Sequence, residues 1–418
     1  FNTDKELRQH LNMLEEARKR DHRKLGVEMD LYVTSELVGS GLPMFTPRGT
    51  VLREEVAKLS NELREARDFQ KVWTPHITKK DLYEKSGHWA KFGDELFLVK
   101  SQETSDQLVM KPMNCPHHTR IYANQPRSYR DLPLRYLETT TDYRDEKTGE
   151  LGGLSRVRAL TQDDSHVFCR PDQINAEVDG LLACARDLYG TVGMKLRVRL
   201  SYRDDSDAYL GAPELWESAQ KQLKDAVIAN NLDYFEQEGE AAFYGPKIEY
   251  TLKDALGRHW QCGTIQVDFS MPERLGAEYV TEASDRKHPV MLHRAILGSL
   301  ERFIGILIEQ HAGALPVWLS PVQAVVLNIT DAQSDYARDV AAELTKAGIR
   351  TKLDTRNEKI TYKIREHALQ KVPYFIVLGD KEKEAGKVAV RARGNQDLGV
   401  MELSALTELI NQAVAERR

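Results

Sequence analysis

The 418-residue sequence predicts a large α+β domain built on an antiparallel sheet, followed by a smaller α/β domain. Three observations predict this division. Short strands separated by polar turns follow one another between residues 231 and 269, as in antiparallel sheets. A proline-bounded segment, residues 316–321, marks a domain boundary. Beyond it, strands and helices alternate over about 100 residues, which is typical of a mostly parallel sheet flanked by helices.

The composition indicates a soluble globular protein. Charged residues make up 29% and hydrophobic residues 41% of the chain, and no apolar run approaches the length of a membrane-spanning helix. The four cysteines form no CxxC pair, which favours reduced thiols in a cytosol-like compartment. The formal net charge of −5 argues against a general affinity for nucleic acid, whereas a local basic stripe is still compatible with it. We therefore expect a cytoplasmic protein without a membrane partner.

The N-terminal part of the chain predicts two helices and a strand. Residues 4–24 repeat apolar side chains at three- to four-residue spacing among dense charge, so an amphipathic helix is expected there. We interpret residues 1–25 as a linker or docking helix. A proline–glycine turn at residues 45–50 precedes the second helix. That helix leads into a strand at residues 70–74, which Pro75 ends.

The middle of the chain, residues 26–315, is predicted to form the large domain. Helices are expected at residues 170–190 and 213–229, each with a repeating apolar stripe. A further wide apolar helix face is expected within residues 286–313, with Ile296 and Leu297 at its start. Strands are expected at residues 96–99, 108–110, 192–200, 233–237, 242–244, 247–252 and 259–269.

The C-terminal part, residues 316–418, is predicted to form the small domain. Its four apolar segments alternate with amphipathic ones, as in β/α units. Strands are expected at residues 324–328, 350–353, 374–378 and 388–393, and helices at residues 333–346, 359–371 and 403–414.

The most informative stretch is residues 142–169, which predicts a hairpin with a glycine-bearing turn. Arg144 and Glu146 would share one face, and Arg156 and Arg158 would share a face across the hairpin, because alternate strand residues point the same way. Such a surface offers guanidinium groups for phosphate and a carboxylate for an amino group. A solvated hairpin with cross-strand ion pairs explains the same residues. The chain contains neither GxGxxG nor GxxxxGK[ST], so nucleotide binding here would use neither a Rossmann nor a P-loop device.

Four stretches resemble the class II aminoacyl-tRNA synthetases, and in particular their threonine-specific branch. The first runs from Arg144 through Arg156-Val157-Arg158 and continues as TQDDSHVFC. The others are MKPMNCPHH (residues 110–118), AFYGPKIEYTL with WQCGTIQVDF (residues 242–269) and HRAILGSLERFIGIL (residues 293–307). The resemblance covers nearly the whole chain in the family's order. It implies an antiparallel class II catalytic domain, an anticodon-binding domain and a homodimer. It also implies an editing module upstream of residue 1, outside this chain.

The resemblance implies a threonine–tRNA ligase that uses ATP with Mg²⁺, threonine and tRNA(Thr). It assigns catalysis to Arg144 and Arg302, which would hold the α-phosphate and clamp the nucleotide. The ATP-binding positions that it implies are Arg144, Glu146, Arg156, Leu160, Gln261, Thr264 and Arg302. The threonine-binding positions are Met113, Gln162, Asp164, Tyr244 and Gln266. The anticodon-reading positions are Asn357, Glu382 and Arg391.

The same resemblance implies one zinc ion per chain, held by Cys115, His166 and His293. From the residues alone, Cys115 is more simply a small buried hydrophobic residue, since it has no CxxC partner. A zinc with three protein ligands keeps an open position, and a site that ligates a hydroxyl rejects valine, which lacks one. His117 stands where many relatives have glycine, so we do not expect it to be a ligand.

Two departures from the family's pattern bear on function. Leu160 stands where relatives carry an aromatic residue that stacks on adenine, so ATP is expected to bind more weakly or in an altered pose. Lys371 replaces an arginine found in relatives. Leu160 supports an alternative reading, in which the chain is a catalytically inactive synthetase paralogue that acts as an RNA-binding or regulatory subunit.

Overall fold

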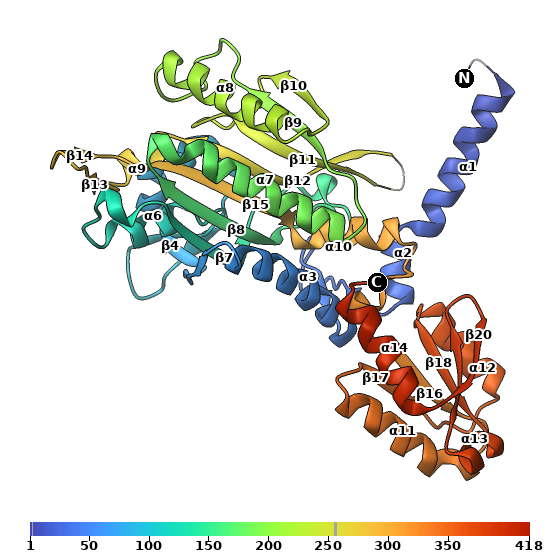
Figure 1. The fold of residues 1–418 in the computed structure, drawn as a ribbon. Coiled ribbons are helices and arrows are strands. Elements are labelled where there is room, and N and C mark those ends of the chain that lie inside the picture. The colour runs from blue at the N-terminus through green and yellow to red at the C-terminus, as the bar shows by residue number, and fades with distance from the viewer. Residues whose placement is uncertain (2, 255–256) are drawn as a thin grey trace. The chain divides into compact units, whose positions relative to one another are not determined.

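The computed structural model describes residues 1, 3–254 and 257–418, which fall into two compact units (Figure 1). One unit comprises Phe1–Leu37, Pro43–Val56 and Gly305–Arg418, and the other comprises Val38–Leu42 and Ala57–Ile304. Helices α3 (Pro47–Glu65) and α10 (Leu300–Gln310) contribute residues to both. The predicted domains 1–25, 26–315 and 316–418 stay predictions. Among the described residues, no helix is both long and apolar enough to span a bilayer.

An eight-stranded sheet forms the centre of the second unit, in the order β10-β9-β11-β12-β15-β8-β7-β3. The prediction of an antiparallel sheet is confirmed, because only the outermost pairs of this sheet, β10–β9 and β3–β7, are parallel. The strands are β3 Gln70–Lys71, β7 Leu134–Tyr143, β8 Ala159–Cys169, β9 Arg197–Tyr202, β10 Tyr234–Glu238, β11 Lys247–Lys253, β12 His259–Asp268 and β15 Val290–Ser299.

Helices and short strands cover this sheet. Helix α7 contacts β15, and α8 contacts β9 and β11 (Figure 1). The apolar stripe predicted for residues 170–190 is buried in α7, which supplies core residues such as Leu181 and Leu188. The remaining helices and strands are α4 Lys80–Ser86, α5 His88–Phe92, α6 Cys115–Ala123, α7 Ile174–Thr191, α8 Pro213–Ala229, α9 Met271–Arg274, β4 Ile77–Lys79, β5 Leu98–Lys100, β6 Gln107–Met110, β13 Tyr279–Val280 and β14 Arg286–Lys287.

The register of the central strands gathers the predicted site residues on one face of the sheet, since residues directly opposite one another share a face. Segments of the chain more than 100 residues apart thereby become neighbours. One row of partners across β7, β8, β15 and β12 is Tyr136, His166, His293 and Gln266; the next row is Glu138, Asp164, Ala295 and Thr264.

The helix expected within residues 286–313 is corrected by the structure. Ile296 and Leu297 belong to strand β15, and α10 begins only at Leu300. The register between β15 and β8 shifts between Ala295 and Ser299. Gly298 has φ +71° there, and a Cβ on it would lie 1.9 Å from the Cys262 carbonyl oxygen. This turn therefore requires glycine. Its neighbours Ile296 and Leu297 are buried and apolar, so in the sequence they continue the apolar pattern of the helix that follows.

The predicted basic strand Arg156-Val157-Arg158 is also corrected. These residues precede β8, which begins at Ala159, and Arg144 and Glu146 follow the end of β7. The hairpin itself is present: β7 pairs with β8 along its whole length, and the Arg144 N–H donates to the Arg158 carbonyl oxygen at 2.9 Å. The arginines therefore lie on the connecting loop beyond the paired strands.

The first unit contains a five-stranded sheet in the order β17-β16-β18-β19-β20. β17, β16 and β18 are parallel, as predicted, whereas β19 and β20 add antiparallel partners. Helix α13 and strand β20 were not predicted. The elements are β16 Ala324–Asn328, α11 Ser334–Lys346, β17 Thr351–Asp354, α12 Ile360–Leu369, β18 Tyr374–Leu378, α13 Asp380–Ala385, β19 Val388–Ala392, β20 Gln396–Met401 and α14 Leu403–Ala415.

The N-terminal helix is shorter than predicted. α1 spans Asp4–Arg20, and a second helix, α2, spans His22–Glu28. Asp21 separates them, because its side chain accepts a hydrogen bond from the Arg23 N–H and so caps α2. A two-stranded ribbon of β1 (Tyr32–Val33) and β2 (Met44–Phe45) follows.

Candidate active site

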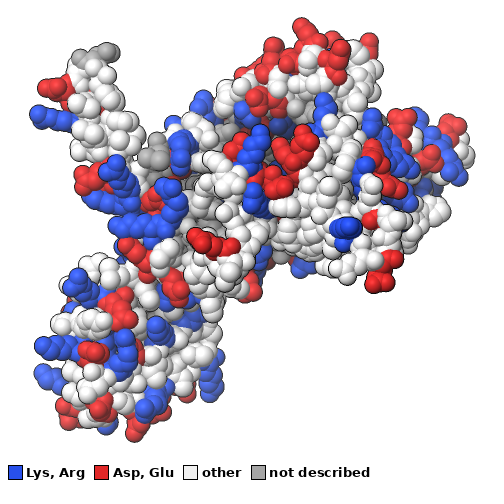
Figure 2. Space-filling model, turned by 180° about the vertical axis from the view of Figure 1, so that it is seen from behind, with Lys and Arg blue, Asp and Glu red and all other residues white. Residues whose placement is uncertain are grey.

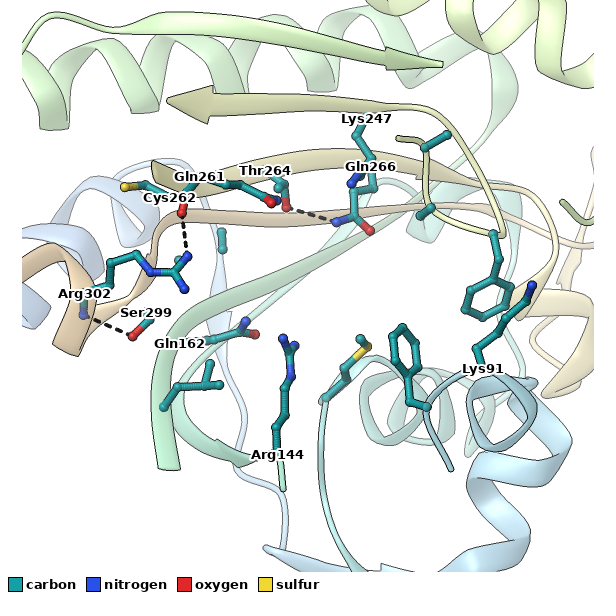
Figure 3. A pocket seen from close by; sticks show the side chains of 18 of the residues that line it. Lys91, Arg144, Gln162, Lys247, Gln261, Cys262, Thr264, Gln266, Ser299 and Arg302 are labelled. Atoms are coloured by element: carbon teal, nitrogen blue, oxygen red, sulfur yellow. Dashed lines mark hydrogen bonds between the residues drawn. The ribbon is translucent and has the colours of Figure 1, made fainter. Parts of the chain in front are cut away.

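A cavity of about 650 Å³ opens on the face of the eight-stranded sheet that carries Thr264 and Gln266. Arg144 and Gln162 point into it from one side, and Gln261, Thr264 and Gln266 from the strand opposite (Figure 3). Of the predicted ATP and threonine positions, all but Asp164 line this cavity. The predicted positions in its lining are Met113, Arg144, Glu146, Arg156, Leu160, Gln162, Tyr244, Gln261, Thr264, Gln266 and Arg302.

Three arginines give one end of the cavity positive charge. Within the described residues, the Arg144 guanidinium makes no hydrogen bond or ion pair, so it is available to a ligand. Arg156 donates from Nε to Glu146 Oε2 at 3.0 Å and also pairs with Glu150 at 3.1 Å. Glu146 and Arg156, both predicted to bind ATP, thus pair with each other. A nucleotide that uses both must replace this ion pair.

Arg302 is held across the cavity by backbone carbonyls. Its Nε donates to the Ser155 oxygen at 2.7 Å. Its Nη1 donates to the Gln261 oxygen at 2.9 Å (Figure 3). Its Cζ lies 5.1 Å from the centre of the Trp260 ring, within reach of a cation–π contact. Burial lowers the pKa of Arg302 below its ordinary value, although arginine at this position still remains charged at neutral pH.

Polar side chains of the opposite wall are fixed by mutual hydrogen bonds. The Tyr244 hydroxyl donates to Gln266 Oε1, and Gln266 Nε2 donates to Thr264 Oγ1 at 3.1 Å. Asp164 lies outside the lining, 93% buried, where it accepts from Asn114 Nδ2 at 3.0 Å. Burial raises the pKa of Asp164. Asn114 binds Oδ2 of Asp164. The other carboxylate oxygen of Asp164, Oδ1, lies 3.9 Å from His166 Nε2.

Cys115, His166 and His293 come together from α6, β8 and β15. One possible ligand atom from each lies within 4.8 Å of those of the other two, and all three residues are buried. His166 Nε2 lies 3.2 Å from His293 Nδ1. Two nitrogens bound to one tetrahedral zinc at about 2.0–2.1 Å would be separated by roughly 3.3 Å. The donor set and spacing therefore fit zinc. Burial raises the pKa of Cys115, and a bound cation would offset that cost of forming the thiolate.

The His293 ring adjoins both this cluster and the cavity. Its Nε2 hydrogen-bonds Asp268 Oδ2 at 2.9 Å, which leaves Nδ1 facing His166. Its ring stacks on that of Tyr244, with centroids 4.7 Å apart and an interplanar angle of 24°. Since Tyr244 lines the cavity, the three-residue cluster adjoins the cavity through this ring contact.

Several functional candidates were missed in the sequence. Lys91 and Lys247 line the cavity, and no pattern distinguished them from other surface lysines. Asp268 supports His293, and its position two residues beyond Gln266 was an available signal. His88 lies 3.6 Å from Cys115 Sγ through its Nε2. Asp142 is fully buried, its oxygens have no hydrogen-bond partner among the described residues, and burial raises its pKa well above the ordinary value.

The predicted anticodon residues lie at two places on the smaller sheet. Asn357 and Glu382 follow the carboxyl ends of the parallel strands β17 and β18, whereas Arg391 pairs with Phe375 near the start of β18. Glu382 already accepts the Gly379 N–H at 2.9 Å, which caps α13. Arg391 and Asn357 are exposed, so their side chains are accessible to a partner.

Two family models match the chain. Residues 97–311 match the tRNA synthetase class II core domain (G, H, P, S and T), and residues 323–413 match an anticodon binding domain. These ranges contain every predicted site residue.

Relatives resemble the chain over almost its full length. It is 54% identical to a threonine–tRNA ligase of Acidovorax ebreus over 99% of this chain and 65% of the relative, and 53% identical to that of Leptothrix cholodnii over 99% and 64%. The chain thus spans about 65% of the length of these relatives.

Solved structures share the fold. The RNA binding domain of threonyl-tRNA synthetase from Cryptosporidium parvum has a TM-score of 0.89 at 36% identity, over 94% of this chain and 98% of that one. A prolyl-tRNA synthetase from the same organism has a TM-score of 0.72 at 18% identity, over 94% of this chain and 75% of that one. That lower identity supports the fold alone. The core-domain match and the 36%-identical structure, taken with the cavity, place this chain in the class II tRNA synthetase family.

Proposed function

We propose that the chain is a threonine–tRNA ligase, which activates threonine with ATP and transfers it to the 3′ end of tRNA(Thr). The observation that carries the proposal is the adjacency of two sites. A cavity with unpaired and clamped arginines lies against a cluster of one cysteine and two histidines. The first suits a triphosphate, and the second suits a metal that recognises an amino acid with a hydroxyl. The threonine–tRNA ligases cited above are similar over 99% of the chain.

In the first step, a carboxylate oxygen of threonine attacks the α-phosphorus of ATP. The new C–O–P linkage forms as the bond to pyrophosphate breaks and pyrophosphate leaves; Mg²⁺ would offset the negative charge of the phosphates. Arg144, which has no partner in the described structure, neutralises the α-phosphate oxygens as charge builds on them. Arg156 exchanges Glu146 and Glu150 for the terminal phosphate. Glu146, once released, accepts from the adenine amino group.

Arg302 and the polar wall orient the reactants. Its two carbonyl contacts hold Arg302 over the nucleotide, where it packs against the base. Cys115, His166 and His293 would hold the zinc, which would supply Lewis-acid chemistry toward a substrate amino or hydroxyl group. Asp164 accepts the threonine hydroxyl with the oxygen that Asn114 leaves free. Met113, Gln162, Tyr244 and Gln266 enclose the rest of the amino acid.

In the second step, a ribose hydroxyl at the tRNA 3′ end attacks the threonyl carbonyl carbon, its proton passes to the departing phosphate, and AMP leaves. The tRNA would also engage Asn357, Glu382 and Arg391 through unpaired anticodon bases. Figure 2 shows lysine, arginine, aspartate and glutamate side chains mixed over the face in view. Such a surface suits a partner that is recognised at local sites.

A homodimer is part of the proposal. Trp73, two residues beyond the edge strand β3, is 75% exposed, and Leu98 is 72% exposed. A second copy of the chain that covered these side chains would remove their apolar surface from water. Light scattering at micromolar concentration tests this: a mass of twice 47.7 kDa is expected, and a monomer would contradict it.

The activity is tested by ATP–pyrophosphate exchange with threonine, serine, valine and proline, before and after slow removal of metal by a chelator. We expect exchange with threonine, weaker exchange with serine, and loss of both after chelation. Absence of exchange with every amino acid, in a chain that still binds tRNA, would favour an inactive RNA-binding paralogue. Leu160 at the adenine position is the observation that keeps this second candidate open.

The role of Arg144 has its own test. An Arg144→Ala chain should lose adenylate formation by orders of magnitude, since the lost contact strengthens as charge develops on the phosphate. Arg67→Ala removes an arginine of the same unit whose partner is Asp187, at 2.6 Å, and serves as the matched control. Near-normal exchange by Arg144→Ala would refute the assignment.

A further inference from the structure

Two side chains that are not part of the Cys115, His166 and His293 cluster form a hydrogen-bonded chain behind it. His166 Nδ1 lies 2.8 Å from His118 Nδ1, and His118 Nε2 lies 3.1 Å from Glu138 Oε2. His118 and His166 are 0% and 1% exposed, and Glu138 is 4% exposed. These groups are thus closed off from solvent and must satisfy one another.

The positions of the hydrogens between Glu138, His118 and His166 can be assigned by starting from Glu138. The carboxylate of Glu138 only accepts hydrogen bonds. It accepts from the Thr74 N–H through Oε1 at 2.7 Å and from the Thr74 hydroxyl through Oε2 at 2.9 Å. His118 Nε2 therefore donates to Oε2. A neutral imidazole that donates from one nitrogen accepts at the other, so His118 Nδ1 accepts.

The assignment continues to the cluster. Since His118 Nδ1 accepts, His166 Nδ1 carries the hydrogen between the two rings. His166 Nε2 is left with its lone pair, and it points at His293 Nδ1, 3.2 Å away. The tautomer of His293 is fixed in the same way, because its Nε2 donates to Asp268 and its Nδ1 is left with a lone pair. Two lone pairs then face each other, an arrangement that a shared cation stabilises and that is repulsive without one.

We propose that Glu138 and His118 are positioning residues, which fix the tautomer of His166 so that Nε2 presents its lone pair to the zinc. Neither touches substrate. The proposal rests on the zinc site proposed above. It also gives a role to Thr74, whose backbone N–H and hydroxyl together hold the carboxylate at the far end of the chain.

The decisive variant is Glu138→Gln. The Thr74 N–H is a fixed donor, so the glutamine oxygen must take the place of Oε1. The NH₂ group then faces His118 Nε2 and donates to it. His118 must donate from Nδ1, His166 Nδ1 must accept, and His166 Nε2 acquires the hydrogen. We expect the zinc affinity, measured by competition with a chromophoric chelator, to fall about 10–100-fold.

Glu249→Gln is the matched control. Glu249 is 0% exposed and lies in the same sheet, but its partners are Lys247 on β11 and Arg199 on β9, and none of them is a ligand in the cluster. Its replacement removes a buried carboxylate without reversing any bond to a zinc ligand. Zinc affinity should stay within about twofold of the parent. A loss equal to that of Glu138→Gln would mean that any buried charge change disturbs the site, and would overturn the proposal.

A second pair of variants keeps the test valid if Glu138→Gln does not fold. His118→Phe removes the acceptor for His166 Nδ1, whereas the amide oxygen of His118→Asn can stand in for Nδ1. We expect weaker zinc binding in the first and recovery of most of it in the second. Equal zinc affinities for His118→Phe and His118→Asn would overturn the proposal that His118 fixes the tautomer of His166. A parent chain that binds no zinc would refute the zinc site itself. A parent that binds zinc, with a Glu138→Gln variant of equal zinc affinity, would refute only the positioning role of Glu138 and His118.

Discussion

Replacing Asp163 with alanine tests how the turn before α10 is held. Asp163 is fully buried on β8 and accepts four hydrogen bonds. The donors are the Ser60 hydroxyl at 2.7 Å and the backbone N–H groups of the turn: Ile296 at 3.2 Å, Leu297 at 2.9 Å and Gly298 at 3.2 Å. These amides lie where the β15–β8 register shifts, and Asp163 provides an acceptor for each of them.

The magnitude follows from these bonds. A buried donor left without an acceptor costs about 1–3 kcal/mol, so three amides and a hydroxyl predict a loss of at least about 4 kcal/mol in the free energy of unfolding. Asp163→Asn keeps one accepting oxygen but turns an NH₂ toward Ile296, so about 1–3 kcal/mol is expected. Ser60→Ala removes a single bond and should cost about 1 kcal/mol.

Urea unfolding followed by tryptophan fluorescence provides the assay. Four of the five tryptophans lie in the same unit as Asp163, and a Trp318→Phe parent removes the fifth. Each variant should also bind an ATP analogue more weakly, because Ser299 and Arg302 directly follow the turn. The exposed Asp187→Asn is the control, with an expected change below about 0.5 kcal/mol. A loss below about 1 kcal/mol for Asp163→Ala would show that the turn does not depend on this carboxylate.

The remaining predictions concern the nucleotide, the amino acid and pH. Leu160→Phe should lower the KM for ATP about 2–10-fold in pyrophosphate exchange, because an aromatic face adds about 0.5–1.5 kcal/mol beyond its buried area; an unchanged KM would contradict adenine packing at this position. This 418-residue chain should charge tRNA(Thr) with serine at a kcat/KM about 10–200-fold below that for threonine, and no charging at saturating serine would overturn the expectation. In the other unit, hydrogen bonds from Arg356 hold the pKa of Asp354 well below its ordinary value. A depressed carboxyl pKa contributes stability above about pH 4 that is lost as the pH falls, so Asp354→Asn should flatten acid unfolding below pH 4; a profile as steep as the parent's would contradict this.

Local chemistry explains which elements were predictable. The strand at residues 374–378 and the helix at 213–229 were predicted with the observed bounds, since a continuous apolar run and a proline-started amphipathic repeat each specify one structure. The helix expected to include Ile296 and Leu297 was wrong because a buried strand and a buried helix turn carry the same apolar residues. Arg156 and Arg158 were placed in a strand by their alternation, which does not reveal where pairing with β7 ends.

The sequence by itself determined the family, most of the elements in their order and most of the residues from which the site is built. The motifs around Arg144, Cys115 and Arg302 carry that information locally, and the family match agrees with them. Only the tertiary structure decided how these residues interact. It pairs Glu146 with Arg156, leaves Arg144 free among the described residues, and places Glu138 and His118 behind His166. The physical reason is that register across β7, β8, β15 and β12 depends on long-range pairing, so residues over 100 positions apart become neighbours only once the sheet has formed.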